Sequence, residues 1–81
     1  MMVTLKLPRF GTNMVEGTLI AWQKKPGESF KEGDVLYDVE TEKVTSSVEA
    51  PCNGTMVEII AQESNIVPVG DPVCRIRKQD T

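Results

Sequence analysis

The sequence has 81 residues, of which 40% are hydrophobic and 26% charged, and its formal net charge at pH 7 is −3. This length allows one small domain with a single modest core. The acidic balance argues against a nucleic-acid-binding protein, which needs a basic patch. The absence of histidine removes the commonest metal ligand and the usual general base.

The cysteines and the apolar runs indicate the environment of the protein. Cys52 and Cys74 have neither CxxC spacing nor a histidine partner, so we expect free thiols in a reducing compartment, with a single disulfide as the alternative. No apolar run approaches the roughly 18 residues of a membrane span. The N-terminus lacks the basic-then-apolar pattern of a signal peptide. We therefore expect a soluble protein of the cytoplasm or the mitochondrial matrix that does not bind membranes.

Short segments of strand-like composition alternate with turn residues along the chain. Residues 2–7 alternate between apolar and polar side chains, which predicts a strand, and a loop follows. Residues 17–24 could form a short helix, but Gly17, Thr18 and Ile20 disfavour it. Further extended segments are expected over residues 28–31, 35–41, 44–50, 55–61, 66–69 and 73–77. The glycines expected to supply the positive φ of tight turns are Gly33, Gly54 and Gly70.

The segments 35–41 and 44–50 are predicted to pair as a hairpin. Apart from Leu36, the apolar side chains of the first segment have odd numbers, and those of the second segment have even numbers. Antiparallel pairing across a two-residue turn places both apolar sets on one face, whereas a loop of odd length would separate them. Glu42 and Lys43 would then form the turn. The expected pairs are Val39 with Ser46, Tyr37 with Val48 and Val35 with Ala50, and Leu36 falls on the polar face.

An internal repeat organises the whole chain. Residues 17–20 match residues 54–57, and Gly33-Asp34 matches Gly70-Asp71, both 37 positions later. Residues 5–8 resemble residues 48–51 at an offset of 43, so the first half carries six extra residues before Gly17. Two similar halves of short strands predict a two-sheet sandwich with approximate two-fold symmetry.

This symmetry places the six-residue insertion in space. A two-fold axis exchanges the ends of the sandwich, so residues 9–16 should lie at the same end as Lys43. By the same argument, the two chain termini should lie at the opposite end. The domain could then be tethered from behind while it presents its hairpin tip.

The chain resembles the lipoyl domain family, the swinging-arm modules of 2-oxo acid dehydrogenase complexes, over nearly its whole length. The stretch around Lys43 is similar to the family motif Glu-Thr-Asp-Lys-Ala/Val, with Glu42 in place of the usual Asp. The matching motifs, in order, are Leu7-Pro8, Gly11, Met14-Val15-Glu16-Gly17, Trp22, Gly33-Asp34, Glu40-Thr41-Glu42-Lys43-Val44, Ala50-Pro51, Gly54 and Gly70-Asp71. The resemblance implies an all-β fold, a flattened barrel or sandwich of two four-stranded antiparallel sheets. It implies a lipoyl-binding domain over residues 1–77, with residues 78–81 as the start of a polar linker or tail.

The resemblance also implies a function. Lys43 would carry lipoic acid as N6-lipoyllysine, attached by a lipoylating enzyme. The carrier would visit a thiamine-diphosphate-dependent decarboxylase, the acyltransferase catalytic core and dihydrolipoamide dehydrogenase. The isolated domain, expected to be monomeric, would be a carrier within a dihydrolipoamide acyltransferase and not itself an enzyme. The 2-oxo acid or acetoin that the complex uses is not implied. Residues expected to be recognised by partners around the tip are Glu40, Thr41, Glu42, Val44, Arg9, Phe10, Gly11, Thr12 and Asn13.

Two other functions remain open from the sequence. A biotin carboxyl carrier has a similar fold but flanks its lysine with methionines, as Ala-Met-Lys-Met, whereas Lys43 lies between Glu42 and Val44. An unmodified protein-interaction module would not depend on Lys43. An enzyme is disfavoured, because so small a sandwich offers neither a histidine nor an obvious deep pocket. Trp22 is expected to pack in or beside the core and not to bind a ligand.

Overall fold

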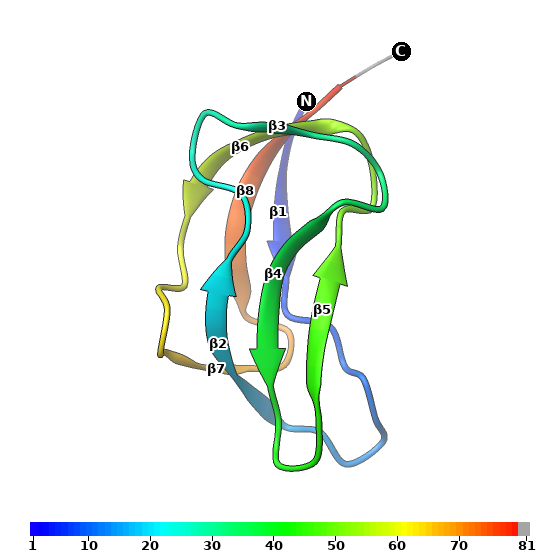
Figure 1. The fold of residues 1–81 in the computed structure, drawn as a ribbon, viewed down its shortest axis with the longest axis vertical. Coiled ribbons are helices and arrows are strands. Elements are labelled where there is room, and N and C mark those ends of the chain that lie inside the picture. The colour runs from blue at the N-terminus through cyan, green and yellow to red at the C-terminus, as the bar shows by residue number, and fades with distance from the viewer. Residues whose placement is uncertain (80–81) are drawn as a thin grey trace.

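The computed structural model describes residues 1–79 and consists of eight strands in two antiparallel sheets (Figure 1). The sheet orders are β1-β8-β6-β3 and β5-β4-β2-β7. This arrangement confirms the predicted all-β fold. Residues 17–24, considered as a possible helix, lie largely in a strand. The strands are β1 (Met2–Lys6), β2 (Glu16–Trp22), β3 (Ser29–Phe30), β4 (Val35–Glu40), β5 (Thr45–Glu49), β6 (Gly54–Ile59), β7 (Ile66–Pro68) and β8 (Pro72–Lys78).

The internal repeat appears in the structure as two-fold symmetry between the sheets. Replacing β1, β8, β6 and β3 by β5, β4, β2 and β7 converts the order of one sheet into that of the other. The irregularities of the strands repeat as well. The pairing of β2 with β4 shifts between Leu19 and Ala21, and the pairing of β6 with β8 shifts 37 positions later, between Met56 and Glu58. The predicted duplication is therefore a property of backbone geometry as well as of residue type.

The core fills the space between the two sheets, and its composition corrects one part of the hairpin prediction. Leu36 and Tyr37 are consecutive, yet both are almost fully buried. The pairing of β4 with β5 shifts between Val35 and Tyr37, so a β-bulge turns Leu36 inward. The predicted pair of Val35 with Ala50 and the predicted outward position of Leu36 are both wrong for this reason. Val35 pairs with Glu49 instead.

Gly54 does not play the role expected of it. The described glycines with positive φ are Gly27, Gly33 and Gly70, whereas Gly54 begins strand β6. A Cβ atom on Gly54 would lie 2.5 Å from the carbonyl oxygen of Arg77. Close approach of β8, and not a left-handed backbone, therefore excludes a side chain at this position.

Trp22 and the two cysteines contribute to packing. The indole Nε1 of Trp22 donates to the carbonyl oxygen of Ala61 at 2.8 Å, and its ring lies 4.8 Å from that of Tyr37. This confirms that Trp22 packs beside the core. Cys74 is buried and Cys52 half-buried, and they are not bonded to each other. No helix among residues 1–79 is long and apolar enough to cross a membrane.

The two ends of the sandwich differ in what they display. The turn between β4 and β5 lies at one end of the long axis, and the start of β1 and the end of β8 lie at the other (Figure 1). The loop between β1 and β2 reaches the same end as the β4–β5 turn, as the symmetry predicted. Strand β8 extends one residue past the expected domain end, because Lys78 pairs with Gly54. The remaining expected tail residues Asp80 and Thr81 lie outside the described residues.

Candidate functional site

The lysine of interest lies on a two-residue turn that the backbone closes tightly. Strands β4 and β5 pair as far as Glu40 and Thr45. Beyond them, the Thr41 N–H donates to the carbonyl oxygen of Val44 at 2.8 Å. Glu42 and Lys43 form the turn, and both side chains are exposed. The two-residue turn predicted from residue parity is therefore confirmed, as are the pairs Val39 with Ser46 and Tyr37 with Val48.

The side chain of Thr41 adds a second clamp to this turn. Its Oγ1 lies 3.3 Å from the backbone nitrogen of Val44, which donates to it, and 3.2 Å from the carbonyl oxygen of Val44. Among residues 1–79, Ser64 is the only non-glycine residue with positive φ. Both central residues of a type I′ turn need positive φ, so Glu42 and Lys43 do not form one. This explains why the tip lacks the Asn-Gly sequence of such turns. The clamp fixes the Cα atom of Lys43 while its side chain stays free in solvent.

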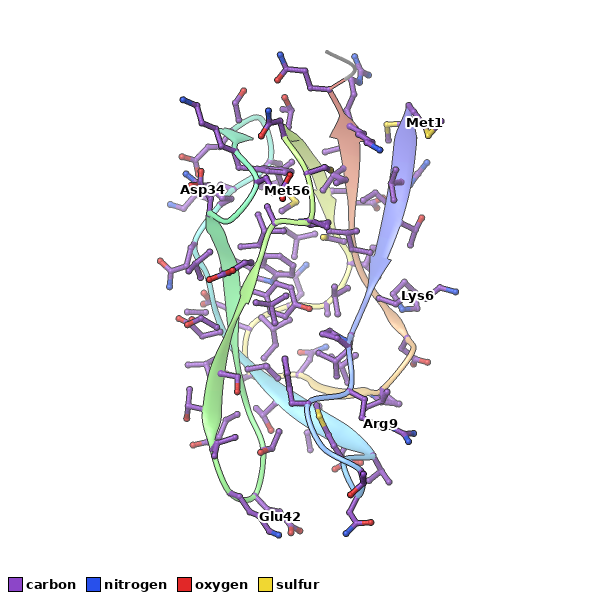
Figure 2. All side chains as sticks on the ribbon, turned by 90° about the vertical axis from the view of Figure 1, so that its right-hand side faces the viewer. Met1, Lys6, Arg9, Asp34, Glu42 and Met56 are labelled. Atoms are coloured by element: carbon purple, nitrogen blue, oxygen red, sulfur yellow. The ribbon has the colours of Figure 1, made fainter. Side chains whose placement is uncertain are left out.

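The loop between β1 and β2 runs beside the hairpin tip and encloses a groove with it. The Met14 N–H donates to the carbonyl oxygen of Gly11 at 3.2 Å, and the Phe10 N–H points at the Sδ atom of Met14 at the same distance. Figure 2 shows this loop and the hairpin reaching the same end of the domain, with Glu42 at its extremity. We call the space between them the tip groove. It is lined by Phe10, Gly11, Thr12, Asn13, Met14, Val15, Glu16, Gly17, Thr18, Glu40, Thr41, Glu42, Lys43 and Val44.

The structure brings together all but one of the residues predicted to surround Lys43. Arg9 does not line the tip groove, and its side chain points away from it (Figure 2). The chain just before it is tied to the body of the domain, because the Leu7 N–H donates to Asp71 O and the Gly70 N–H to Leu7 O. The groove residues that the prediction omitted are Met14, Val15, Glu16, Gly17 and Thr18. Thr18 reaches the groove because β2 pairs with β4 and places Thr18 opposite Glu40, a pairing that the sequence alone did not show.

The tip groove combines acidic and apolar side chains. Glu16, Glu40 and Glu42 are exposed around it. Within residues 1–79 the only ion pair is that of Arg75 with Glu58. The ammonium group of Lys43 therefore has no carboxylate partner among these residues. Apolar side chains are also exposed at the groove, although water disfavours them. Phe10 is 42% exposed, Val44 53% and Val15 71%.

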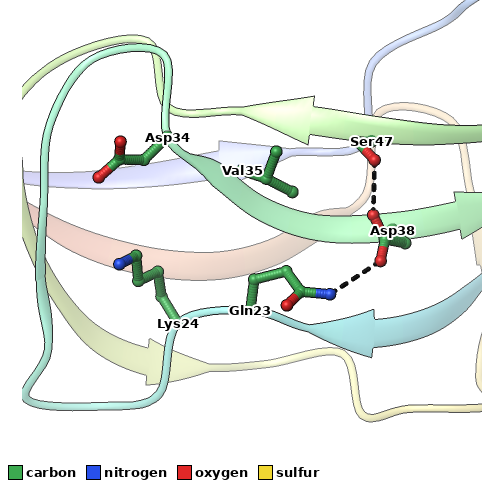
Figure 3. A pocket seen from close by; sticks show the side chains of 6 residues that line it. All are labelled: Gln23, Lys24, Asp34, Val35, Asp38 and Ser47. Carbon is green, nitrogen blue, oxygen red and sulfur yellow. Dashed lines mark hydrogen bonds between the residues drawn. The ribbon is translucent and has the colours of Figure 1, made fainter.

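A second depression lies on the outer face of sheet β5-β4-β2-β7 and has a structural explanation. Figure 3 shows Asp38 between two strands, with Ser47 Oγ donating to Oδ1 at 2.7 Å and Gln23 Nε2 donating to Oδ2 at 2.9 Å. These bonds join β4 to β5 and to the end of β2. The rest of the depression is formed by Lys24, Asp34 and Val35. Among the described residues, no group of three or more Cys, Asp or Glu side chains is placed to hold a metal ion.

These features define a class of protein: a two-sheet β-sandwich domain that displays a lysine on a hairpin tip, with its termini at the opposite pole. The chain belongs to the biotin and lipoyl attachment family, whose family model, described as "Biotin-requiring enzyme", matches residues 3–76. Its fold matches the solution structure of the lipoyl domain of the 2-oxoglutarate dehydrogenase complex from Azotobacter vinelandii. The two are 32% identical, with a TM-score of 0.79 over 96% of this chain and 99% of the other.

Further relatives differ in how much they establish. The chain is 43% identical over 67 residues to the "Dihydrolipoyllysine-residue acetyltransferase component of acetoin cleaving system" of Pseudomonas putida, which is 83% of this chain and 18% of that protein. It is 41% identical over 78 residues to the succinyltransferase component of the 2-oxoglutarate dehydrogenase complex of Rickettsia conorii, which is 96% of this chain and 20% of that protein. The chain thus spans about a fifth of these relatives. A multi-domain long-chain acyl-CoA carboxylase matches with a TM-score of 0.83 over 99% of this chain and 7% of that one, but at 19% identity this shows the fold alone.

Lipoyl domains carry lipoate covalently, and the hairpin tip fits this group. Lys43 is exposed and unpaired within the described residues, so conversion of its amine to an amide breaks no ion pair. The turn holds the Cα atom in place, while the four-carbon side chain keeps its freedom. A flexible arm on a fixed base is the requirement for a group that must reach other proteins.

Proposed function

We propose that this domain carries lipoate as an amide on Lys43 and shuttles acyl groups and reducing equivalents between the active sites of a 2-oxo acid or acetoin dehydrogenase complex. The observation that carries the proposal is the position of Lys43, exposed on a clamped two-residue turn at the pole opposite the termini. Bound lipoate supplies a dithiolane that takes up acyl groups and electrons. The protein supplies attachment, orientation and delivery.

The residues around Lys43 divide this work between them. Thr41 holds the turn, so that a lipoylating enzyme meets the lysine in one backbone geometry. Tethering from the far pole confines the tip near its partners and replaces free diffusion by a search at high effective concentration. Glu40, Glu42, Val44 and the loop residues 10–13 form the surface that partners read next to the attachment point.

The partners follow from the proposed role. The domain belongs to a dihydrolipoamide acyltransferase in the cytoplasm or in mitochondria, as one relative from Caenorhabditis elegans is described as mitochondrial. Its partners are a thiamine-diphosphate-dependent decarboxylase, the acyltransferase core, dihydrolipoamide dehydrogenase and a lipoylating enzyme. The polar residues after β8 begin the linker to the rest of that protein.

A biotin carrier is the second candidate, since the description of the matching family model includes biotin. The flanking residues favour lipoate. Lys43 lies between Glu42 and Val44 and not between two methionines.

The test is production of the domain with a lipoylating enzyme and lipoate, followed by intact mass and peptide mapping. We expect one lipoyl group, on Lys43, and a net charge that changes from −3 by one further negative unit, visible as faster migration in a native gel. Lys43→Arg should abolish the modification, whereas Lys31→Arg, a matched change on the exposed turn before β4, should not. Biotin on Lys43, modification elsewhere, or no modification would each contradict the proposal.

A further inference from the structure

The strands of the two sheets carry charges of opposite sign. In sheet β5-β4-β2-β7 no strand contains a lysine or arginine, and the charged residues are Glu16, Asp38, Glu40 and Glu49. In sheet β1-β8-β6-β3 the one acidic residue is Glu58, and the basic residues are Lys6, Arg75, Arg77 and Lys78. The chain as a whole has a net charge of −3, so a basic sheet does not follow from its composition.

The opposite charges occupy equivalent positions of the internal repeat. The offset of 37 relates residues of β4 to residues of β8, and the offset of 43 relates residues of β5 to residues of β1. The equivalent pairs are Asp38 with Arg75, Glu40 with Arg77, and Glu49 with Lys6. At each of these three positions, an acidic residue in one sheet is therefore replaced by a basic residue in the other.

The strand pairing confirms that these positions are equivalent in space. Glu40 lies opposite Thr45 of β5, and Arg77 lies opposite Met2 of β1, which is the counterpart of Thr45. The other two positions agree as well: Asp38 opposite Ser47 corresponds to Arg75 opposite Thr4, and Glu49 opposite Val35 corresponds to Lys6 opposite Pro72. The two sets of three charges thus share one backbone arrangement and differ in sign.

All six side chains lie on the outer faces of the sandwich. Their neighbours along the strands, such as Val39 and Ile76, are fully buried, and successive side chains of a strand point to opposite faces. Figure 2 shows Lys6 pointing away from the domain. We call the two sets the acidic face (Asp38, Glu40 and Glu49) and the basic face (Lys6, Arg75 and Arg77).

The two faces are far enough apart to act independently. Strands β4 and β5 lie on one side of the domain, and β1 and β8 lie on the other (Figure 2). The domain measures 18 Å along its shortest axis, whereas the electrostatic screening length in physiological salt is about 8 Å. A charged group that approaches the basic face is therefore attracted by that face more strongly than it is affected by the net charge of the chain.

We propose that the acidic face of one copy of the chain docks on the basic face of a second copy. A second copy is the occupant because each face finds its complement, charge for charge on the same backbone arrangement, in the other face. The contact is heterologous, since each copy contributes a different surface. It is also weak and transient, because each exposed ion pair contributes little. The dilute domain stays monomeric, and copies associate where they are held close together.

This mode of docking leaves Lys43 accessible. Both faces run along the long axis of the domain, whereas the turn that bears Lys43 lies at one end of that axis (Figure 1). The ion pair of Arg75 with Glu58, 3.7 Å long, does not prevent docking, since both side chains are about half exposed. The contact needs no group on Lys43, so it stands or falls independently of the carrier role.

The first experiment measures self-association of the 81-residue chain. Amide spectra of the isotope-labelled chain are recorded from about 0.1 mM to about 2 mM, a range in which a millimolar Kd is detected. We expect signals of β4 and β5 and of β1 and β8 to shift with concentration, and these shifts to fall severalfold at about 0.5 M NaCl because of screening. Shifts that are absent from these strands, or that salt does not reduce, would overturn the proposal and leave the faces to other proteins.

Two unlabelled variants, added to dilute labelled wild type, test which face meets which. Lys6→Glu/Arg77→Glu makes both faces acidic, so it should shift signals of β1 and β8 in the labelled chain but not those of β4 and β5. Glu40→Arg/Glu49→Lys makes both faces basic and should do the reverse. Each substitution introduces the residue of the symmetry-related position, which the equivalent backbone already accommodates. Shifts on both sheets with either variant would contradict docking of the acidic face on the basic face.

The matched control is Lys25→Glu/Lys31→Glu. It changes the net charge by the same four negative units as Lys6→Glu/Arg77→Glu, but on exposed loop residues outside both faces. Because it keeps one acidic and one basic face, it should shift signals on both sheets of the labelled chain, as unlabelled wild type does. If it acted like Lys6→Glu/Arg77→Glu, net charge would be the cause of the shifts and the proposal would be wrong.

Discussion

The backbone N–H of Lys78 donates to the carbonyl oxygen of Met1 at 2.7 Å, and this bond is the two-fold counterpart of the one from Thr41 to Val44 at 2.8 Å. Lys78 lies 37 positions after Thr41, and Met1 lies 43 before Val44, which are the two offsets of the repeat. The pole that bears the termini is thus built like the pole that bears Lys43, but its turn is open.

This relationship predicts that the termini can be closed into a hairpin. Replacing Asp80 and Thr81 by one glycine and joining it to Met1 makes Gln79 and the glycine a two-residue turn between Lys78 and Met1. Glu42 and Lys43 form the equivalent turn between Thr41 and Val44. New termini between Gln62 and Glu63 fall in an exposed loop, where circular permutation is best tolerated. We expect circular dichroism and a thermal midpoint within about 5 °C of the parent. A permutant that does not fold would show that the two poles are not equivalent.

The backbone of Ser64 is predicted to be strained, because Ser64 occupies a position that is glycine in the symmetry-related half. Its φ is 74°, and its counterpart 37 positions earlier is Gly27, with φ 94°. The equivalence extends to bonding, since the Gly27 N–H donates to Met56 O and the Ser64 N–H to Leu19 O. A left-handed conformation costs a non-glycine residue about 1 kcal/mol. Ser64→Gly should therefore raise the free energy of unfolding by up to about 1 kcal/mol.

The reverse change provides the control for Ser64. Gly27→Ser places the same side chain on the same backbone in the other half, where no atom lies within 4 Å of a Cβ. It should lower the free energy of unfolding by a similar amount in urea denaturation. If Gly27→Ser has no effect, strain is not the reason for the glycine.

Much of this architecture could be predicted from the sequence, because the period-two alternation of the strands and the internal repeat are both visible in the order of residue types. Parity located the turn at Glu42 and Lys43, and symmetry placed the loop beside it. The β-bulges could not be found in this way. A bulged residue such as Leu36 changes which face its neighbours point to, but nothing in its residue type marks the bulge. A prediction from strict alternation therefore continues past it without a shift.

The composition of the tip groove was predictable only in part, for a related reason. The loop was expected beside Lys43, but its sequence does not tell which residues face the hairpin. Arg9 follows a segment bonded to the body of the domain and points away, whereas Val15 and Glu16 are brought to the groove by pairing with β7. These directions depend on tertiary hydrogen bonds between residues distant in sequence.

Thr41 is predicted to order the tip through its hydroxyl group. Thr41→Val keeps the shape of the side chain but removes the acceptor of the Val44 N–H. The loss of about 1 kcal/mol corresponds to a roughly fivefold smaller population of the closed turn. Amide hydrogen exchange at Thr41 and Val44, whose N–H groups are bonded in the closed turn, should accelerate by that factor, and lipoylation should slow. Thr45→Val is the control, because Thr45 is exposed on β5 and lies outside the clamp. If exchange accelerated as much in Thr45→Val as in Thr41→Val, the hydroxyl group of Thr41 would not be what orders the tip.

The stability of the domain is predicted to fall at high pH because of two buried acidic groups. Burial raises the pKa of the Cys74 thiol from 9.0 to about 12, and burial, with a smaller effect of Cys74, also raises the pKa of the Tyr37 hydroxyl. In the unfolded chain both groups lose their protons at lower pH than in the folded domain. Their contribution is complete below about pH 9 and is lost as pH rises toward the folded values, by at most about 1.4 kcal/mol per pH unit for each group.

Urea denaturation at pH 7 to 11 tests this dependence with two matched truncations in the core. Cys74→Ala removes one of the two groups, so the free energy of unfolding should decline less steeply above pH 9 than in the wild type. Val73→Ala truncates the adjacent buried side chain and removes no titratable group. It should lower the stability at every pH but keep the wild-type slope. An identical slope in Cys74→Ala and Val73→Ala would show that the thiol does not titrate in this range, and Tyr37 would then have to account for any remaining pH dependence.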